Sequence, residues 1–286
     1  MSEDIDNSGK ERTHAMKATV LLDNIGTEEL AGDWGLSFYI EYAGKKILLD
    51  AGGESCLFAE NARKLGLSLA DVDCAVLSHA HYDHADGMTE FFEENRTAKL
   101  FLQASCGENC WRVKEDHMKY IGIRTGMLEA YRDRLCRVQG DMELLPGVRL
   151  IGHHTPGLEE AGKREKMFLK DGENWVTDCF AHEQSLVFEL EDGIVIFNSC
   201  SHGGADNIIR EAAAVYPGRR IRVMVGGFHL HNKTDEYIRA LAHRMRETGV
   251  EEIYTGHCTG ENGYRVLREE LGGMAHQLHV GLEMEF

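Results

Sequence analysis

Long apolar runs, prolines and basic side chains are all scarce in this chain. No stretch approaches the roughly 20 continuous apolar residues that a membrane-spanning helix requires, so we expect no transmembrane segment. Only 3 of the 286 residues are proline, which excludes a proline-rich linker or scaffold. The 31 basic residues are outnumbered by 48 acidic ones. The net charge of −17 argues against a duplex nucleic-acid partner, because phosphate contacts need clustered Lys and Arg.

Apolar residues make up 43% of the chain, which is enough for a buried core in one large domain or two small ones. The first 16 residues are polar and lack the apolar core of a signal peptide. We therefore expect a disordered tail at 1–16 and a single folded domain at 17–286. The eight cysteines are scattered, as is typical of thiols in a reducing compartment, so we expect a cytoplasmic protein.

The domain contains an internal repeat of one pattern. Residues 37–41 align with 185–189, and residues 47–50 align with 195–198, as strand, tight turn and strand in each copy. A helix and a further strand follow in both copies, at 57–65 and 75–77 and again at 207–215 and 223–225. The sequence therefore predicts two similar halves, each contributing a sheet and outer helices to a layered α/β sandwich.

The segment between the halves is less regular. Residues 108–121 are compatible with a helix, and residues 140–155 contain short strand-like pieces. Residues 157–181 are charged, contain glycine and show no clear period. We expect an insertion or long loop around 157–181, which would form part of the rim of a pocket.

The strongest functional signal is a histidine-rich segment after the apolar strand at 75–77. It reads Ser78-His79-Ala80-His81-Tyr82-Asp83-His84. His79 and His81 point to the same side of an extended chain, and Asp83 and His84 follow where the chain turns toward a helix. Buried imidazoles and carboxylates each need a polar partner, whereas a divalent cation accepts them as ligands. This pattern predicts a metal site; the alternative is a solvated histidine-rich turn.

The motif His-x-His-x-Asp-His, with Asp-x-Gly upstream at 50–52, resembles that of the metallo-β-lactamase superfamily of metallohydrolases. The resemblance covers residues 18–260. It implies an α/β fold, a four-layer αββα sandwich of two similar halves, in agreement with the internal repeat.

The resemblance also implies how a metal centre would be assembled. His79 and His81 would bind one ion, whereas Asp83 and His84 would bind a second. A late segment similar to the family's final motif adds His257 to the second ion. Zn²⁺ is the expected metal, as one or two ions, and Mn²⁺ or Fe²⁺ would also accept these ligands.

Two further ligand positions depart from the simple pattern. A His-x-Pro-Gly-like sequence at 154–157 nominates His154 as the third ligand of the first ion. The family's metal-bridging Asp is missing, and Cys200 occupies its place. The candidates to replace it are His202 and the Cys200 thiolate, although Cys200 could equally be a small buried strand residue.

Three runs, at 199–203, 226–230 and 257–260, resemble a narrower branch of the family. This branch is labelled dihydropterin-ribofuranosyl-aminobenzene-phosphate synthase-like and is linked to methanopterin-type pterin chemistry. Within the second run, His229 ends a strand where the repeat places it opposite His81. His229 is therefore a candidate catalytic residue that would orient substrate or stabilise developing negative charge. The alternative is a structural hydrogen bond at a strand end.

These residues predict a metal-dependent hydrolase. A bound divalent ion lowers the pKa of water to about 7. The metal-bound hydroxide, oriented by Asp83, would attack a small ester, phosphoester, phosphodiester, lactone or thioester. The alternatives are a transferase or synthase in pterin cofactor assembly, a non-catalytic binding protein, and a di-iron redox protein, which His81 disfavours because such relatives carry Glu there. We expect a small-molecule substrate and neither a nucleic-acid nor a membrane partner; the sequence leaves the oligomeric state open.

Overall fold

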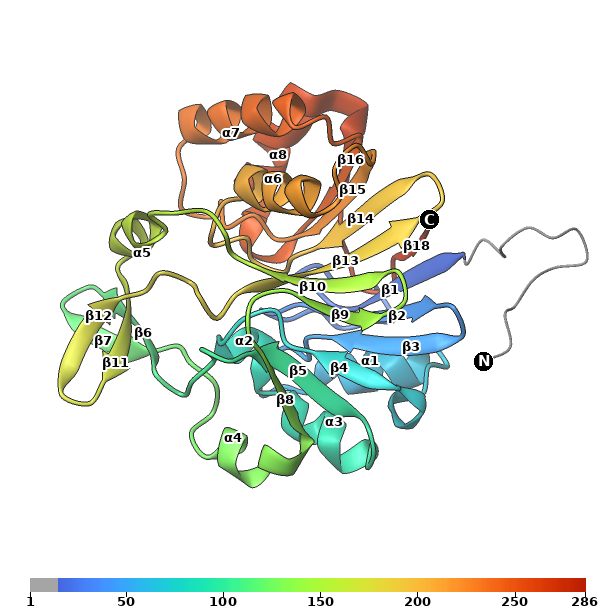
Figure 1. Cartoon of the computed structure of the whole chain (residues 1–286), viewed down its shortest axis with the longest axis vertical. Coiled ribbons are helices and arrows are strands. Elements are labelled where there is room, and N and C mark those ends of the chain that lie inside the picture. The colour runs from blue at the N-terminus through green and yellow to red at the C-terminus, as the bar shows by residue number, and fades with distance from the viewer. Residues whose placement is uncertain (1–14) are drawn as a thin grey trace, which may run out of the picture.

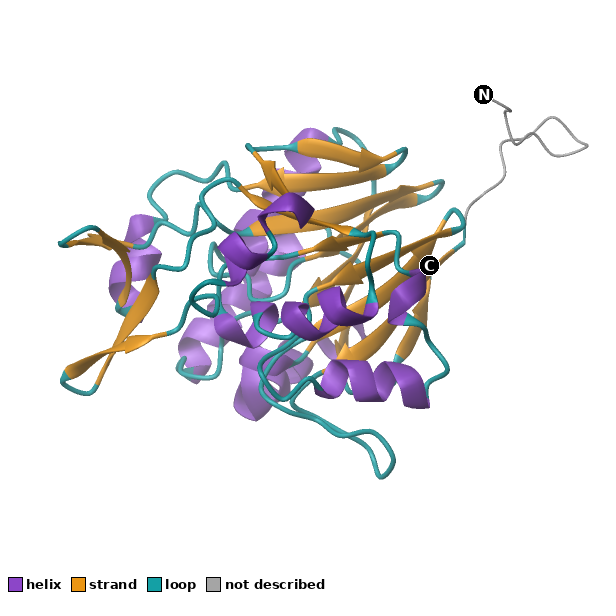
Figure 2. Cartoon of the chain, turned by 90° about the horizontal axis from the view of Figure 1, so that it is seen from below, coloured by secondary structure: helices purple, strands orange, loops and turns teal. Residues whose placement is uncertain are grey.

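Two seven-stranded sheets lie face to face at the centre of the molecule, and helices cover the outer face of each (Figure 1, Figure 2). The computed structural model describes residues 15–286. Buried apolar side chains from both sheets pack between them, and the ring centroids of Phe38 and Phe197 lie 5.4 Å apart there. The layers are helix, sheet, sheet and helix, which confirms the αββα sandwich predicted from the sequence.

Each sheet combines an antiparallel hairpin with parallel strands. The first sheet has the order β18-β1-β2-β3-β4-β5-β8, with strands at Glu283–Glu285, Met16–Leu22, Ser37–Tyr42, Lys45–Leu49, Cys74–Val76, Lys99–Gln103 and Leu135–Val138. The second has the order β17-β16-β15-β14-β13-β10-β9, with strands at Ala275–Gln277, Glu252–Thr255, Ile221–Gly226, Gly193–Phe197, Gln184–Leu190, Val148–Gly152 and Met142–Leu145. The hairpins β2–β3 and β13–β14 both lead into parallel strands, so the two sheets are built alike.

The repeat predicted from the sequence is confirmed by this topology. The turn between β2 and β3 is tight because Ala43 and Gly44 both adopt positive φ, 51° and 73°, as in the type I′ turns that suit the twist of a hairpin. The predicted helices at 57–65 and 207–215 correspond to α1 and α6, and the predicted strands at 75–77 and 223–225 to β4 and β15.

The outer helices pack on the sheets through apolar stripes. In α7, Thr234 caps the N-terminus by accepting the Tyr237 N–H, and Ile238, Leu241 and Met245 are buried at helical spacing. Figure 1 shows α6, α7 and α8 over the second sheet and α1 and α3 over the first. The helices are α1 Leu57–Lys64, α2 Tyr82–Ala85, α3 Met88–Glu94, α4 Met127–Ala130, α5 Glu159–Glu165, α6 Ala205–Val215, α7 Asp235–Glu247 and α8 Gly260–Leu271.

A third, four-stranded sheet projects from one side of the sandwich (Figure 1). Its order is β12-β11-β6-β7, with strands at Asn174–Thr177, Met167–Asp171, Cys110–Lys114 and His117–Tyr120. The prediction of a helix at 108–121 is therefore wrong. Pairing of β6 with β11, distant in sequence, and edge-to-face packing of Trp111 with Tyr120 and Trp175 outweigh local helix propensity here.

The insertion expected around 157–181 is not an irregular loop, since it forms α5, β11 and β12. Residues 1–14 of the tail predicted at 1–16 lie outside the described residues, while Met16 already begins β1 and pairs with Tyr42. Within the described residues, no helix combines the length and apolar surface needed to cross a bilayer.

Candidate metal centre

The candidate ligands come from loops at the carboxyl ends of strands in both sheets. His79 and His81 follow β4, and the short helix α2 presents Asp83 and His84 directly afterwards. From the second sheet, His202 follows β14, and a 3₁₀ turn after β16 begins at His257. These six side chains lie in the buried interior between the two halves: His79, His81, Asp83, His84, His202 and His257.

His79, His81 and His202 form the first group. Their ring centroids lie 4.6 Å (His79 to His81), 5.0 Å (His79 to His202) and 4.8 Å (His81 to His202) apart. The Nε2 atoms of His79 and His81, and both ring nitrogens of His202, are buried with no hydrogen-bond partner among the described residues. Such orphaned nitrogens are costly unless something binds them. Burial lowers the pKa of His81 to about 3 and the pKa values of the other two well below normal, so all three imidazoles are neutral, as metal ligands must be.

Asp83, His84, His257 and Cys200 form the second group. Nε2 of His84 lies 3.2 Å from Nε2 of His257 and 3.2 Å from Sγ of Cys200. Oδ2 of Asp83 lies 3.5 Å from Nε2 of His257. Burial opposes ionisation of Asp83, but His84 and His257 hold its pKa below its usual value, so it is a carboxylate. Carboxylate, imidazole and thiol in one buried place fit a divalent transition metal.

Cys200 lies between the two groups. Its Sγ is within 4.8 Å of ligand atoms of His79 and His202 on one side and of His84 and His257 on the other. The sulfur therefore belongs to both groups of candidate ligands and would be the atom available to replace the missing Asp. Burial and the neighbouring Cys258 raise the pKa of the Cys200 thiol, so a bound cation would be needed to hold it as thiolate.

Asp50 orients the histidines of both groups from behind, a role that sequence analysis did not assign. Its Oδ2 lies 2.8 Å from Nδ1 of His84 and 2.6 Å from Oγ of Ser78, which in turn lies 2.8 Å from Nδ1 of His79. In the same way, Oδ1 of Asn24 lies 3.0 Å from Nδ1 of His257. These contacts place the ring protons on Nδ1 and leave the Nε2 lone pairs facing the site. The Asp-x-Gly sequence at 50–52 was the available signal for Asp50.

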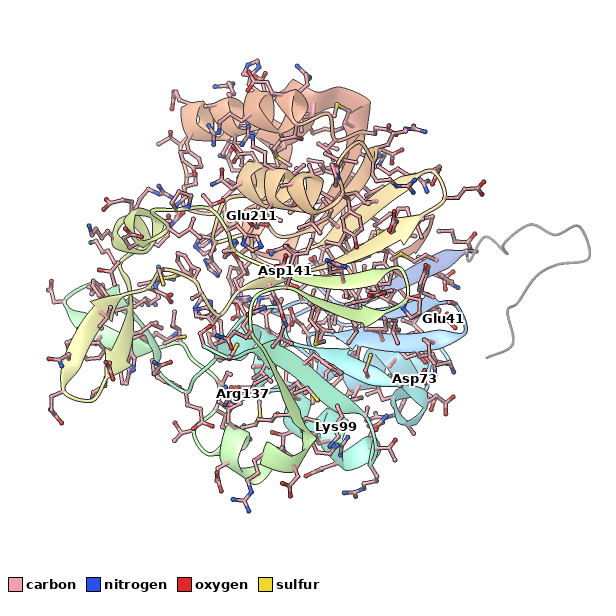
Figure 3. The ribbon with its side chains drawn as sticks, viewed as in Figure 1. Glu41, Asp73, Lys99, Arg137, Asp141 and Glu211 are labelled. Carbon is pink, nitrogen blue, oxygen red and sulfur yellow. The ribbon has the colours of Figure 1, made fainter. Side chains whose placement is uncertain are left out.

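His154 is not brought to either group. Its side chain is 54% exposed, and its Nε2 bonds Asp141 at 2.9 Å, while its backbone N–H donates to Glu211. Figure 3 labels these two partners, Asp141 and Glu211. Adjacent side chains of an extended chain point to opposite sides, and here His153 takes the inward direction. His153 is buried between Glu183 and Glu211, which raise its pKa to about 10 against the effect of burial.

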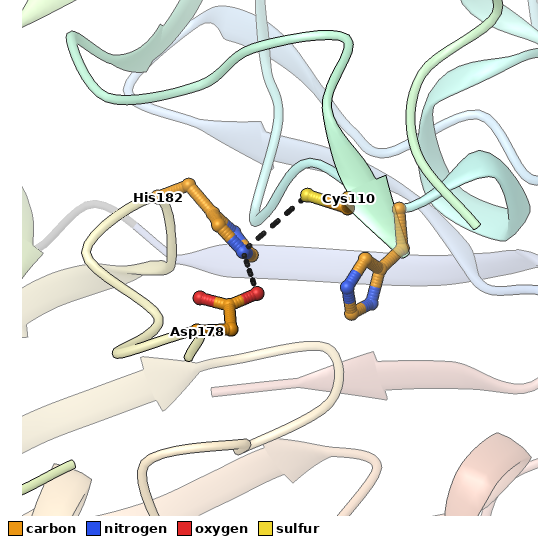
Figure 4. A group of neighbouring side chains, drawn as sticks. Cys110, Asp178 and His182 are labelled. Carbon is orange, nitrogen blue, oxygen red and sulfur yellow. Dashed lines mark hydrogen bonds and ion pairs between the residues drawn. The ribbon is translucent and has the colours of Figure 1, made fainter. Parts of the chain in front are cut away.

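A histidine that sequence analysis missed, His182, lies beside the first group. Figure 4 shows it with Asp178 and Cys110. Its Nδ1 accepts the Ala80 N–H at 3.2 Å, so its Nε2 carries the proton and donates to Asp178 at 3.1 Å, with Sγ of Cys110 at 3.8 Å. His182 packs edge-on against His81, with ring centroids 5.5 Å apart. Both nitrogens of His182 have protein partners, and its ligand atom lies within 4.8 Å of those of His81, Cys110 and Asp178. The available signal was its place immediately after the predicted insertion.

His229 faces the same centre from the second half. Its ring centroid is 4.5 Å from that of His202, and its Nε2 is 3.6 Å from Oε2 of Glu165. Burial opposes protonation, but Cys258 and Glu165 raise the pKa of His229 to about 9. Its φ of 50° is unusual for a side-chain-bearing residue, and His257 shares this left-handed geometry. Backbone strain of this kind is tolerated mainly where function needs it.

A cavity of about 170 Å³ opens onto both groups of ligands. Its wall includes His81, Asp83, Cys200, His202, His229 and His257, together with aromatic and basic side chains at the mouth. The structure thus brings seven of the eight predicted site residues together, all except His154, and five of the seven line this cavity: His81, Asp83, His202, His229 and His257.

Comparisons with known proteins agree with this geometry. A family model described as the metallo-beta-lactamase superfamily matches residues 33–158, which include the histidine-rich segment. The 7,8-dihydropterin-6-methyl-4-(beta-D-ribofuranosyl)-aminobenzene-5'-phosphate synthase of Methanocaldococcus jannaschii is 26% identical over 93% of this chain and 98% of its own. The exodeoxyribonuclease WalJ of Streptococcus pneumoniae is 23% identical over 90% of both chains.

Among solved structures, Tm1679 is described as a metal-dependent hydrolase of the beta-lactamase superfamily. It is 27% identical to this chain and matches it with a TM-score of 0.81, covering 95% of this chain and 99% of its own. The similarity to the synthase agrees with the branch that the sequence motifs indicated. Fold, ligand arrangement and whole-length similarity agree: the chain has the metallo-beta-lactamase fold and is similar to enzymes of that superfamily.

Proposed function

We propose that this enzyme is a metal-dependent hydrolase of a small ester, phosphoester, phosphodiester, lactone or thioester. The observation that carries the proposal is the packing of three histidine rings, His79, His81 and His202, whose unpartnered nitrogens lie beside a second group of carboxylate, imidazole and thiol. Zn²⁺ suits this mixture of nitrogen, oxygen and sulfur donors, with Mn²⁺ and Fe²⁺ as alternatives. A divalent ion there supplies Lewis acidity, which polarises a carbonyl or phosphoryl oxygen and lowers the pKa of water.

Two side chains would take part in the reaction directly. Asp83 is ionised and accepts a hydrogen bond from the attacking water, which fixes the orientation of that water. His229 is protonated at neutral pH and donates its proton to the leaving oxygen as the bond to it breaks. The His202 ring lies 4.5 Å from that of His229 and 4.8 Å from that of His81, so the acid is close to the first group of ligands.

The test combines metal content with turnover. Plasma mass spectrometry on untagged protein, never exposed to added metal, is expected to find two equivalents per chain. A panel of 4-nitrophenyl esters, phosphate mono- and diesters, lactones and thioesters is expected to include a substrate. His81→Ala and Asp83→Asn should each lower turnover at least about a hundredfold with an unchanged fold. His154→Ala, the matched histidine control, should keep both metal and turnover. Turnover at the wild-type rate in either of the first two variants would contradict the proposal.

A synthase acting on a pterin substrate is the second candidate, favoured by the whole-length similarity to a named pterin-pathway synthase. Product analysis separates the two: hydrolysis incorporates one oxygen from ¹⁸O-labelled water, whereas group transfer joins two substrate fragments. A protein that binds two metal ions but turns over neither class would instead be a binding protein on the same fold.

The proposal places the enzyme in the cytosol with a small-molecule substrate. All eight cysteines are free thiols, including Cys200 and Cys258 in the centre, and a reducing compartment keeps them in this state. Fractionation of the cells of origin, followed by immunodetection, tests this placement.

A further inference from the structure

Basic side chains of the β6–β7 hairpin line the mouth of the cavity in this acidic protein. Arg112 and Lys114 come from β6 and Lys119 from β7, and all three border the hollow that contains the metal ligands. We propose that this cationic face, defined as Arg112, Lys114 and Lys119, binds a phosphate group carried by the small substrate of the metal centre. The inference rests on the proposed function, since it assigns the substrate class of the same site.

The strand register places the three cations on one face of the hairpin. Arg112 is paired directly with Lys119 across the two antiparallel strands. Lys114 lies two residues beyond Arg112 and therefore points to the same side. Like charges directly opposite each other destabilise a sheet. In this hairpin, the like-charged pair lies where a bound anion would reduce the repulsion between the two side chains.

The cationic face has no carboxylate partner among residues 15–286. Within the part of the chain that the structure describes, no ion pair involves Arg112, Lys114 or Lys119, although the chain carries 48 acidic residues. Nε of Arg112 is buried with no hydrogen-bond partner among these residues. The ammonium of Lys119 lies 5.9 Å from the ring centroid of Tyr82, at the start of α2. A guanidinium and two ammonium groups without acidic partners are donors suited to phosphate oxygens.

Main-chain bonds hold the hairpin against the metal-binding loop. His81 forms an antiparallel bridge with Gly122, just past the end of β7, and Tyr82 N–H donates to the Ile121 carbonyl at 3.0 Å. On its other side, β6 pairs with β11, where Met167 lies opposite Arg112 and also lines the cavity. The cations are therefore fixed in position relative to the ligands His81 and Asp83. A phosphate bound there would orient the rest of the molecule toward the metal centre.

The size of the cavity favours a small phosphorylated molecule over a polymer. Its volume of about 170 Å³ suits a single anionic group with part of its attached molecule. A second pocket lies near α6, and its lining includes Arg210 and Arg244. Both of these arginines already bond the carboxylate of Asp206. The cationic face is thus the better-prepared anion site beside the metal centre.

The test measures binding directly, with a probe that cannot turn over. Isothermal titration of the protein as purified uses phenylphosphonate, whose P–C bond resists hydrolysis, and inorganic phosphate as a second arm. The double variant Arg112→Gln/Lys119→Gln should bind phenylphosphonate at least about tenfold more weakly, and with a shallower dependence on salt. Arg112→Lys should retain most of the binding. Lys170→Gln, on the same small sheet but away from the cavity, is the matched control and should bind as the wild type does.

Each outcome decides between the alternatives. Weaker binding of both probes supports a general phosphate site, whereas weaker binding of phenylphosphonate alone shows that the attached group is also recognised. Unchanged binding in the double variant, with full metal content, would overturn the inference. Melting temperatures show whether the double variant is folded. The melting temperature of this variant should equal or exceed that of the wild type, because a like-charge pair is removed. If the double variant does not fold, Lys114→Gln at the exposed end of β6 tests the same surface.

Failure of this inference can be told apart from failure of the proposed function. Weaker binding in the double variant, without turnover of any panel substrate by the wild type, would leave the phosphate site standing and remove the hydrolase. Normal turnover by the wild type, with equal phosphonate binding in the wild type and the double variant, would leave the hydrolase standing and remove the phosphate site.

Discussion

The replacement Asp50→Asn tests whether hydrogen bonds to Asp50 fix the orientation of the candidate metal-binding histidines. Asp50 is fully buried, and its positive φ of 57° turns its side chain under the histidines. Its Oδ2 accepts from Nδ1 of His84 at 2.8 Å and from Oγ of Ser78 at 2.6 Å, while its Oδ1 accepts the Ser78 N–H at 2.7 Å. An amide offers one oxygen to these three donors and points an N–H group at another of them. His84 would then lose the contact that fixes its tautomer.

The magnitude follows from the kind of contact that is lost. A hydrogen bond from a carboxylate to a metal-binding histidine is typically worth about 10–100-fold in metal affinity. At about 1.4 kcal/mol for each factor of ten, this corresponds to about 1.4–2.8 kcal/mol. We expect the Kd of the ion held by His84 to rise by this factor. The ion held by His79, His81 and His202 should be affected less, because Asp50 reaches only His79, and only through Ser78.

The assay is competition between the metal-stripped protein and a chromophoric chelator, with Zn²⁺ and Co²⁺ titrated separately. Ser78→Ala is the matched control, because it removes the hydroxyl next to His79 but leaves the direct contact between Asp50 and His84. Circular dichroism and melting temperature establish that both variants are folded. Wild-type affinities for both ions in folded Asp50→Asn would refute the reasoning that Asp50 orients His84.

Three further predictions use other parts of the molecule. Cys200→Ser should abolish the thiolate-to-metal charge-transfer absorption of the Co²⁺-substituted protein, whereas Cys56→Ser should retain it; an unchanged spectrum in Cys200→Ser would exclude the sulfur as a ligand. His153 has a pKa raised from 6.5 to about 10 by Glu183 and Glu211, so its stabilising effect is complete below about pH 6.5 and lost as the pH rises through about 10. The difference in unfolding free energy between wild type and His153→Gln in urea should shrink over that range, and a constant difference would count against the ion pairs. Phe188→Ala, between the sheets, should lower the free energy of unfolding by about 3–5 kcal/mol, and a loss below about 1 kcal/mol would show that the interface can close around the gap.

The first half of the metal centre was predictable because its ligands are contiguous. A strand followed by a turn places His79, His81, Asp83 and His84 on one loop, and only local geometry is needed to bring them together. The repeat of strand, turn and helix was equally accessible, since period-2 and helical patterns recur in both halves. Local order in the chain was therefore sufficient for the fold class and for one side of the site.

The second half of the centre depends on where distant loops meet. His153 and His154 are neighbours in an extended segment, and which of them faces inward is decided by Glu183 and Glu211 from other elements. Similarly, His182 reaches the site only because a structured insertion returns the chain beside His81. Such choices depend on tertiary contacts, so the motif around His154 alone does not show which of the two neighbouring histidines faces inward.

The misassigned segment at 108–121 and the proposed phosphate site have a common physical origin. In a helix, Arg112 and Lys119 would lie almost two turns apart and would not oppose each other, and solvent would screen both. As strands, the same residues are forced into direct cross-strand register, an arrangement that local preferences and electrostatics both disfavour. Natural sequences tend to agree across these levels, and the places where they conflict tend to be functional. The paired Arg112 and Lys119 lie on the face of the third sheet that lines the cavity of the metal centre. An anionic group of the substrate is therefore the simplest explanation for this pairing of like charges.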